Sequence, residues 1–428
     1  MLIVFVVFLA LLLFIGMPVS FAIGISGVLF FLQNPSLPIT MIVQLPISQT
    51  QNSAILAIPL FIFAGNLLNA CGITKRLVKL STLLTGHMRG GLAQVSVVLS
   101  TLMGGVSGSA TADAAMEARI LGKDMIEKGY SKGYTANVIA WTSLITATIP
   151  PGIGIIIYGT VGEVSIGRLF ATGLFVGILM MIFMMITVFI TSKIFGYKPE
   201  RDKAAGFREI LESLKETIWA LIFPIILLVG IRFGLFTTSE VGAFACVYAL
   251  LVGLFVYKEL TVANFLESLR DTVVDIGGIM FIIAMSGTFG YGIPYERLPQ
   301  KLTELFLGVS TNPILVLYMI VVFLVVLGMF MEGSVTILLL TPIFLPLMQS
   351  LGVDPVFFGL IMCTTITAGL NTPPVGISMY AVNSILGCSM KEYTKHMFPW
   401  LIVVLIQVSL LILLPEVVLF LPNLLFGA

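Results

Sequence analysis

Long apolar runs without a charged side chain dominate this sequence. No Asp, Glu, Lys or Arg precedes Lys75. Because a helix needs about 20 apolar residues to cross the hydrocarbon core of a bilayer, such runs predict membrane helices. The predicted helical runs are 2–32, 53–70, 92–112, 133–160, 169–192, 217–231, 241–257, 276–293, 313–331, 333–350, 356–380 and 397–414. The pattern predicts an all-α polytopic membrane protein.

The composition supports this prediction. Of 428 residues, 58% are hydrophobic and only 10% are charged, and the mean hydropathy is +1.10. Soluble domains carry about a quarter charged residues, so this chain has too few to cover a surface in water. The net charge of +1 gives no reason to expect a nucleic-acid partner. The four cysteines lack metal-ligand spacing and are predicted to be packing residues.

The first apolar run has no basic residue before it and continues past Gly16-Met17-Pro18 to about Phe31. Such a run is too long for a cleavable signal peptide. It predicts a first membrane helix that is kinked where glycine and proline meet.

The basic residues indicate which segments face the cytoplasm. Segment 193–216 carries the largest positive cluster and is predicted to be cytoplasmic by the positive-inside tendency. Segments 71–91 and 123–132 are also basic, and only the apolar stretch 92–122 separates them. A single crossing would place one of the two on the outer side. The stretch 92–122 is therefore predicted to be a re-entrant hairpin.

The predicted hairpin tip is rich in small residues. Residues 104–109 contain three glycines and two serines. Such residues unwind helices, and unwound backbone at membrane depth is tolerated only inside protein or beside a polar cavity. The alternative is a close-packed crossing of two helices through small residues. The density of small residues here favours the hairpin.

Four short patterns recur about 220 residues later, in the same order. Any one match could be chance, but four collinear ones indicate an internal repeat. The patterns are PxxGIxxY at 151–158 and 373–380, GSxT at 108–111 and 333–336, FIxA at 61–64 and 281–284, and RL at 76–77 and 297–298.

Each half then has two helices, a charged amphipathic connector (73–90 or 294–310), a hairpin and two more helices. The run 217–231 has no counterpart, so one extra crossing inverts the second half. Inverted repeats with broken helices are typical of secondary transporters that bind at the membrane midplane. The expected organisation is a first repeat at 1–192 (hairpin 92–122, broken helix 133–160), a cytoplasmic connector plus linking helix at 193–235, and a second repeat at 236–428 (hairpin 313–350, broken helix 356–380).

A double proline interrupts one long apolar run in each half, at 150–151 and at 373–374. Proline lacks an amide donor and prevents the preceding helix from continuing. The break frees carbonyls of the last turn and amides of the restarting helix. Free carbonyls suit a small hard cation such as Na⁺, and the positive end of a half-helix suits a carboxylate. A proline kink without a ligand is the alternative for each break.

We expect each hairpin tip to face the broken helix of its own half and to form one cation site there, giving two or more Na⁺ ions. The candidate ligands are Ser107, Gly108, Ser109, Asp113, Ile149, Pro150 and Gly152 in the first half, and Gly333, Ser334, Thr336, Asn371 and Thr372 in the second. The candidate substrate contacts at the tips and breaks are Ser107, Thr111, Pro151, Gly154, Glu332, Pro374 and Gly376.

Charged residues inside membrane spans are costly and usually functional. Asp113 lies one turn past Ser109 on the same helical face. It is predicted either to supply negative charge near the first cation site or to pair with Arg119. Glu332 lies at the second tip, and Asp275 lies near the start of its span, where an interfacial position would explain it.

Enzyme classes find no support in the sequence. It has no His-Glu-x-x-His zinc motif, no phosphate-binding loop, no paired intramembrane aspartates and no nucleophile with a nearby base. The chain is therefore not expected to be an enzyme or to hydrolyse ATP. A channel remains an alternative to a transporter, because re-entrant loops and inverted repeats also build pores.

Three stretches resemble a known family: GGVSGSATADAAM at 104–116, TIPPGIGIIIYG at 148–159 and LNTPPVGISMY at 370–380. They are similar to the large membrane (DctM-type) subunit of tripartite ATP-independent periplasmic (TRAP) transporters, and the likeness runs along essentially the whole chain. Within the family, the resemblance favours the sialic-acid subgroup. It implies a Na⁺-driven symporter of the bacterial inner membrane that imports an organic acid, sialic acid or alternatively a C4-dicarboxylate, by an elevator-type mechanism.

The same resemblance implies two partners: a small four-helix membrane subunit and a periplasmic substrate-binding protein. Because Met1 begins directly in the first predicted helix, we expect the small subunit to be a separate chain. Carried over by position, the functional stretches of the two hairpins match Ser107, Ser109 and Asp113 in the first half and Gly333, Ser334 and Asn371 in the second. The two amphipathic connectors are expected to lie along the membrane interface and brace a moving domain.

Overall fold

The computed structural model describes residues 16–51 and 53–427, and every regular element within them is helical. The predicted all-α architecture is thus confirmed. Six described helices are long and apolar enough to cross a bilayer, or eight if two bent pairs each count as one span. Residues 2–15 of the predicted first helix lie outside the described part. The six are α11 (Ile166–Phe195), α12 (Phe207–Arg232), α13 (Thr238–Leu251, extended to Val256 by a π-helical turn), α14 (Val262–Tyr295), α17 (Gly333–Ser350) and α20 (Met390–Leu413).

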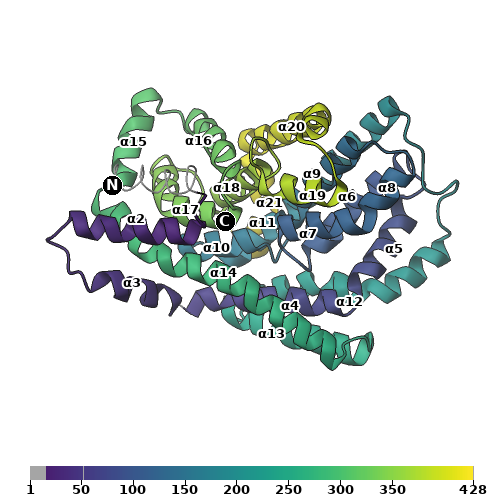
Figure 1. The fold of residues 1–428 in the computed structure, drawn as a ribbon, viewed down its shortest axis with the longest axis horizontal. Helices are drawn as coiled ribbons and strands as arrows, with labels where there is room; N and C mark the ends of the chain where they lie inside the picture. The colour runs from purple at the N-terminus through teal and green to yellow at the C-terminus, as the bar shows by residue number, and fades with distance from the viewer. Residues whose placement is uncertain (1–15, 52, 428) are drawn as a thin grey trace.

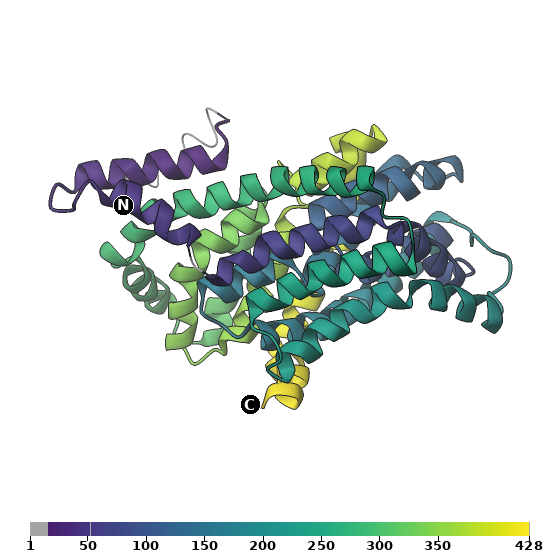
Figure 2. The same ribbon diagram turned by 90° about the horizontal axis from the view of Figure 1, so that it is seen from below.

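One side of the molecule is a layer of helices that we call the scaffold layer. In this layer α4 packs against both α13 and α14, and α14 also packs against α2. Figure 1 shows these helices along the lower side of the molecule, and in Figure 2 the purple α4 lies between helices of the second half. The layer therefore joins the two halves of the chain. It consists of α2 (Val19–Gln33), α3 (Met41–Thr50), α4 (Ala57–Ala70), α12, α13 and α14.

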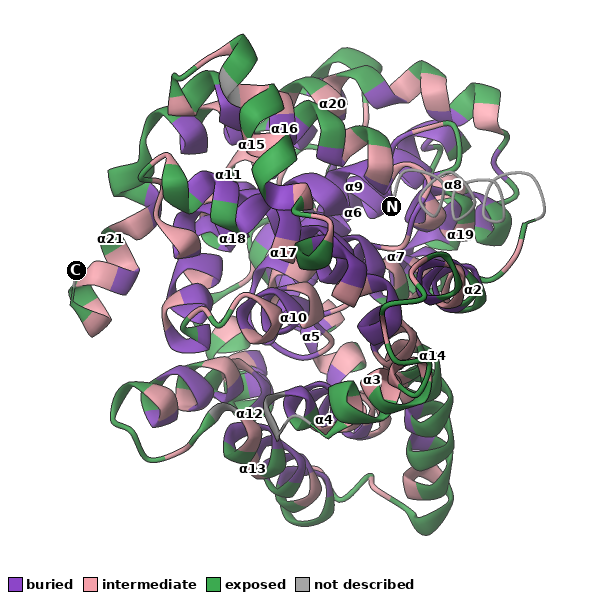
Figure 3. Ribbon diagram, turned by 90° about the vertical axis from the view of Figure 1, so that its left-hand side faces the viewer, coloured by how far each residue is buried: buried purple, intermediate pink, exposed green. Residues whose placement is uncertain are grey.

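The remaining large body, the hairpin bundle, contains both predicted hairpins and both predicted broken helices. Its buried residues lie at the centre of the molecule, and exposed ones cover the outside (Figure 3). The outside is apolar: on α11, for example, Ile186 is 51% exposed and Ile190 is 52% exposed. Exposed aliphatic side chains in such numbers are stable against lipid rather than water.

In the first half, the chain folds back on itself between α6 (Gly91–Gly104) and α7 (Ala110–Glu117). Ser96 and Ser100 on α6 hydrogen-bond Glu117 at the end of α7, so the two arms lie side by side. A π-helical turn (Ala118–Gly122) and α8 (Lys123–Glu127) follow. The next helix is broken into α9 (Lys132–Thr148) and α10 (Ile153–Val161), which are bent by 42°.

The second half repeats this order of elements. Its hairpin folds back between α16 (Pro313–Gly328) and α17, where the rings of Phe323 and Phe344 pack 5.6 Å apart. Its broken helix is α18 (Pro355–Gly369) followed by α19 (Ile377–Leu386). The amphipathic connectors form α5 (Ile73–Thr85) and α15 (Leu298–Val309). The bend between α4 and α5 is 71°, so α5 turns sharply away from α4.

Corresponding helices begin with similar local chemistry. The side chains of Ser131 and Asp354 accept backbone hydrogen bonds at the starts of α9 and α18. Ser165 and Ser389 do the same for α11 and α20. Such caps satisfy amides that the first turn leaves unpaired. The starts of corresponding helices are therefore stabilised in the same way in the two halves.

Several helix boundaries differ from the apolar runs. α12 begins at Phe207 rather than near 217, and α14 begins at Val262 rather than near 276. The added turns are charged and amphipathic, with Arg208 paired to Glu212 one turn later. Apolar runs mark only the part of a helix that lipid surrounds, so they miss such ends. The runs also did not predict α3 or the short C-terminal α21 (Pro415–Phe426).

Candidate functional site

The first hairpin tip is bonded to the first broken helix. Gly108 has a left-handed backbone, with φ of 63°. Its carbonyl oxygen accepts a hydrogen bond of 3.2 Å from the amide of Ile153, the first residue of α10. A Cβ at Gly108 would overlap the carbonyl oxygen of Pro151. Only glycine therefore allows the tip to approach the break this closely.

The first predicted cation ligands lie around this contact. The side-chain oxygen of Ser109 accepts a hydrogen bond from the amide of Ala112 and so caps the start of α7. Ser107 lies in the tip, and its buried Oγ has no hydrogen-bond partner. On the facing side, Ile149 and Gly152 have extended backbones between α9 and α10, with Pro150 between them. The structure thus brings the predicted tip residues and the predicted break residues together.

Asp113 lies on α7, one helical turn after Ser109 at the tip, and is 1% exposed. Its Oδ2 lies 2.5 Å from the hydroxyl of Thr146 on α9, and its buried Oδ1 has no partner. Among the described residues no cation forms an ion pair with Asp113. Arg119 is exposed and lines a neighbouring cavity, so the alternative that it pairs with Asp113 is wrong.

The second half reproduces the contact between tip and break. The amide of Gly376 in the break donates to the carbonyl of Met329 at the second tip, at 2.8 Å. Asn371 is fully buried, and neither its Oδ1 nor its Nδ2 has a partner. Thr372 follows it and donates its hydroxyl to Ala368 on α18. A buried amide side chain without partners is costly unless it serves a ligand.

Glu332 has a local role at the second tip. Its carboxylate accepts hydrogen bonds from the amide of Val335 and the hydroxyl of Ser334, both at 3.1 Å, and so caps α17. Thr336 donates its hydroxyl to the carbonyl of Glu332. Gly333 lies close to the break, because a Cβ there would be 3.5 Å from Leu370. These predicted residues surround the second tip, but Glu332 is engaged by its own helix.

The two halves meet across the molecule. The hydroxyl of Thr111 on α7 lies 2.7 Å from that of Ser378 on α19. In the reciprocal contact, Gly154 on α10 packs against Ile337 on α17. Each hairpin therefore contacts the broken helix of the other half as well as its own. Of the remaining substrate candidates, Pro151, Pro374 and Gly376 all lie in the breaks at this junction.

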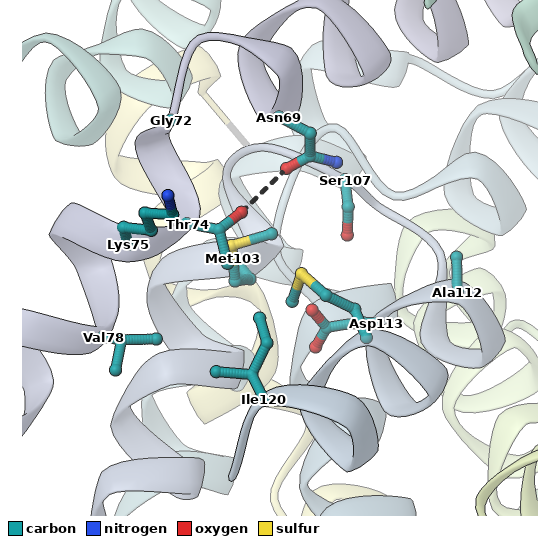
Figure 4. Close-up of a pocket in the computed structure, with 11 residues that line it drawn as sticks. Asn69, Gly72, Thr74, Lys75, Val78, Met103, Ser107, Ala112, Asp113 and Ile120 are labelled. Atoms are coloured by element: carbon teal, nitrogen blue, oxygen red, sulfur yellow. Dashed lines mark hydrogen bonds between the residues drawn. The ribbon is translucent and has the colours of Figure 1, made fainter. Parts of the chain in front are cut away.

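A cavity of about 580 Å³ separates the first hairpin from the bend between α4 and α5. Figure 4 shows Ser107 and Asp113 on the hairpin side and Lys75 on the opposite side. Asn69 and Thr74 also line it and contact each other at 3.4 Å. A second cavity of about 540 Å³ shares Ala112, Met116 and Ile120 with it, and its other lining residues are Asn66, Ala115, Arg119, Arg270, Asp271, Val274 and Asp275. Together the two cavities border the hairpin on its scaffold side.

Sequence reasoning missed several polar residues of this region. Lys75 and Asn69 are brought to the cavity by the bend after α4, which apolar runs do not reveal. Glu117 is fully buried inside the first hairpin. In the sequence, the one indication that Glu117 belongs to this region is its position four residues after Asp113, which places both acids on one helical face. Asp275, predicted to be interfacial, lines the second cavity and accepts a hydrogen bond of 3.4 Å from Asn66.

The cysteines and histidines offer no alternative site. All four cysteines are buried and free, as predicted for packing residues. No group of three or more His, Cys, Asp or Glu residues suited to a metal occurs among the residues that the structure describes. The polar centre of the molecule is instead built from hydroxyl, amide, carbonyl and carboxylate groups.

Comparisons with known proteins place this architecture in one family. The family model described as "Tripartite ATP-independent periplasmic transporter, DctM component" matches residues 5–417. The chain is 34% identical to the sialic acid TRAP transporter large permease protein SiaM of Vibrio cholerae, over 97% of each chain. It is 32% identical to the C4-dicarboxylate TRAP transporter large permease protein DctM of Pseudomonas aeruginosa, over 94% of each.

A solved structure supports the fold. The Alcanivorax borkumensis YdaH transporter superposes with a TM-score of 0.60 over 91% of this chain and 88% of that one, at 12% identity. The sequence relatives are transporter permeases, so the prediction that the chain is not an enzyme is confirmed. The chain belongs to the DctM family, the large permease components of TRAP transporters, and is a multi-pass membrane protein.

Proposed function

We propose that this chain is the permease of a Na⁺-coupled importer of an organic acid, best matched by sialic acid. The observation that carries the proposal is the paired contact of tip and break. The amide of Ile153 donates to the first tip and the amide of Gly376 donates to the second, so each tip is bonded to the break of its own half. Unwound backbone at this depth is the usual site of ion and substrate binding in secondary transporters.

The choice of Na⁺ rests on the type of polar group available. Ser107, Asp113 and Asn371 each have a buried oxygen without a partner, and they lie at the two tip-and-break contacts. Hard cations prefer such oxygen ligands. We therefore propose one Na⁺ ion at each of the two tip-and-break contacts, held by the ligands predicted from the sequence.

The substrate class rests on the relatives. Their names include sialic acid, C4-dicarboxylates and 2,3-diketo-L-gulonate. All of these are carboxylic acids, and a further relative is named for isethionate, a sulfonate, so a group that binds an organic anion is expected. Lys75 lines the cavity that Ser107 and Asp113 also line, opposite the hairpin. We propose that this cavity admits the acid and that Lys75 attracts its carboxylate.

The elevator mechanism rests on how the two bodies meet. The cavities lie between the hairpin and the scaffold layer, whose helices join the two halves. A hairpin bundle that slides along this layer would carry the bound acid across the bilayer. The connector α5 packs against α12 of the scaffold layer and against α6 of the first hairpin, so it lies where the two bodies meet.

The family also indicates the assembly. We propose that a small four-helix membrane subunit, as a separate chain, and a periplasmic substrate-binding protein complete the transporter in the bacterial inner membrane. The exposed apolar faces of the scaffold layer can accept lipid or such a subunit.

The test is uptake of labelled sialic acid into proteoliposomes that contain this chain, the small subunit and the binding protein. We expect uptake only with all three proteins and an inward Na⁺ gradient. Uptake of a C4-dicarboxylate instead would change the substrate and keep the mechanism. Uptake without a binding protein, or with no effect of Na⁺, would contradict the proposal and favour an ordinary carrier or a channel.

Lys75→Gln is expected to raise the KM for the acid about tenfold with little change in the maximal rate. A charge-assisted hydrogen bond is worth about 1.5–3 kcal/mol, and 1.4 kcal/mol corresponds to a factor of ten. The measurement is initial uptake against substrate concentration. Lys79→Gln, which removes an equal charge paired with Glu216 outside the cavity, is the control. Equal KM values for the two variants would contradict the role of Lys75.

A further inference from the structure

The first hairpin contains a second carboxylate, Glu117, that the proposed tip site does not use. Glu117 is 0% exposed and lies one helical turn beyond Asp113 on α7. No lysine, arginine or histidine within the described ranges 16–51 and 53–427 forms an ion pair with either acid. Two carboxylates so placed in a low-dielectric interior are stable only if a positive charge compensates them or if they hold a proton.

Glu117 lies in a shell of hydroxyl groups from α6 and α9. The hydroxyls of Ser96 and Ser100 are 2.5 Å and 2.7 Å from its two carboxylate oxygens. The hydroxyl of Thr142 on α9 is 3.2 Å from that of Ser96. All of these residues are 0% exposed. The three hydroxyls and the two carboxylate oxygens together give five side-chain oxygens from three helices.

Two of the three hydroxyls in this shell are directed in an unusual way. Serine and threonine in apolar helices commonly donate to the carbonyl four residues earlier, as Thr101 and Thr148 do on these same helices. Ser96 and Ser100 are instead directed at Glu117. Thr142 follows the common pattern and donates its hydroxyl to the carbonyl of Val138 at 2.9 Å, so its oxygen can act only as an acceptor in the shell. The two serine hydroxyls are therefore organised around the carboxylate and not merely satisfied by their own helix.

Asp113 connects this shell to the tip. Thr146 contacts both Asp113 Oδ2 and the carbonyl oxygen of Ser100, at 2.5 Å and 2.9 Å. The second oxygen of Asp113, Oδ1, is unpartnered although the residue is 99% buried. This buried, unpartnered oxygen is available to bind a ligand. Immediately after Glu117 the helix widens into the π-helical turn Ala118–Gly122, a feature frequent at functional sites.

We propose that Glu117, Ser96, Ser100 and Thr142 form a further Na⁺ site, one turn deeper in the hairpin than the tip site, with Asp113 between the two. This inference rests on the proposed Na⁺ coupling. With both sites filled, two Na⁺ ions balance the two carboxylates. The hairpin would then move with no net charge on these residues, which lowers the cost of crossing the membrane interior.

The basic residues that line the two cavities do not replace such an ion. Lys75 lies across the first cavity, and Arg119 and Arg270 line the second. Neither cavity is lined by Glu117. Asp113 does line the first cavity. An ion would therefore enter the shell from that cavity, past Asp113 and the polar groups between Asp113 and Glu117.

The test compares Glu117→Gln with wild type in the full complex. Bound ²²Na⁺ per complex and the Na⁺ to substrate ratio, from substrate accumulation at fixed Na⁺ gradients, are both expected to fall by one. Glutamine has the same shape but lacks the charge. Glu127→Gln, an exposed acid on α8 paired with Lys123, is the control and should change neither value. Ser96→Ala is expected to weaken Na⁺ binding at the same site, and it serves if Glu117→Gln does not fold.

The outcomes separate this inference from the proposed function. Wild-type complex that binds no Na⁺ and transports without it would contradict both. Wild-type complex that is Na⁺-coupled, with a Glu117→Gln variant of unchanged ²²Na⁺ count and ratio, would overturn only the further site. A variant that keeps its Na⁺ count but loses a dependence on external pH would show that Glu117 holds a proton instead, and it too would overturn the Na⁺ assignment.

Discussion

Gly108→Ala is expected to lower Na⁺-driven uptake at least tenfold while the protein still inserts and folds. Gly108 has a left-handed backbone, which costs a residue with a side chain about 1–2 kcal/mol. In addition, its Cβ would overlap the carbonyl oxygen of Pro151. The tip would then move away from the break between α9 and α10, and the hydrogen bond from the amide of Ile153 would be lost. Because the predicted ligands come from both sides of this contact, the separation would dismantle the first cation site.

The measurement is initial uptake under a fixed Na⁺ gradient, normalised to the amount of monodisperse protein. Gly129→Ala is a matched control, because Gly129 also has a positive φ, 90°, but nothing lies within 4 Å of a Cβ there. That variant carries the backbone strain without the overlap and should transport within about twofold of wild type. Equal activity of the two variants would mean that the close approach of tip and break is not required.

Asp113→Asn is expected to abolish Na⁺ coupling. Asparagine preserves the shape of the side chain and its contact with Thr146 but removes the charge. At about 4 Å and an effective dielectric constant of about 20, the attraction between a carboxylate and Na⁺ is worth about 4 kcal/mol. That energy corresponds to about a thousandfold in Na⁺ affinity. Uptake at ordinary Na⁺ concentrations should then fall to the background of empty liposomes.

Uptake is measured against Na⁺ concentration, and binding of ²²Na⁺ provides a readout that does not depend on transport. Asp124→Asn is the control, since Asp124 is an exposed acid on α8. An Asp113→Asn complex with the Na⁺ dependence of wild type would remove Asp113 from the cation site. The buried carboxylate would then need a structural explanation, with Thr146 as its main partner.

Several features follow from the sequence because they depend on local chemistry. The scarcity of charge before Lys75 requires a lipid environment, whatever the tertiary structure. Each double proline lies in the break that follows α9 or α18, because a helix cannot continue through it. α18 already ends at Gly369, before Pro373. The glycines and serines after Gly104 interrupt the first hairpin at the predicted tip. The recurrence of these patterns anticipated the matching order of helices in the two halves.

Other features depend on contacts between distant segments, which no local pattern contains. The sequence placed Asp113 beside a tip but left its pairing with Arg119 open. The fold decides this by directing the carboxylate toward Thr146 on α9 and leaving Arg119 exposed. It also joins Thr111 to Ser378, 267 residues apart, and brings Lys75 to the cavity through the bend after α4.

Glu117 is the clearest case of a residue whose environment the sequence alone does not reveal. By sequence it is an acid at the end of an apolar stretch, where most acids face water or lipid headgroups. The structure buries it because α6 and α9 pack against α7 and supply hydroxyls from Ser96, Ser100 and Thr142. Apolarity and helix breaks are properties of single segments, so the sequence alone determined the membrane class, the breaks and the tips. Burial of a charge depends on which segments pack against it, and only the tertiary structure decided that.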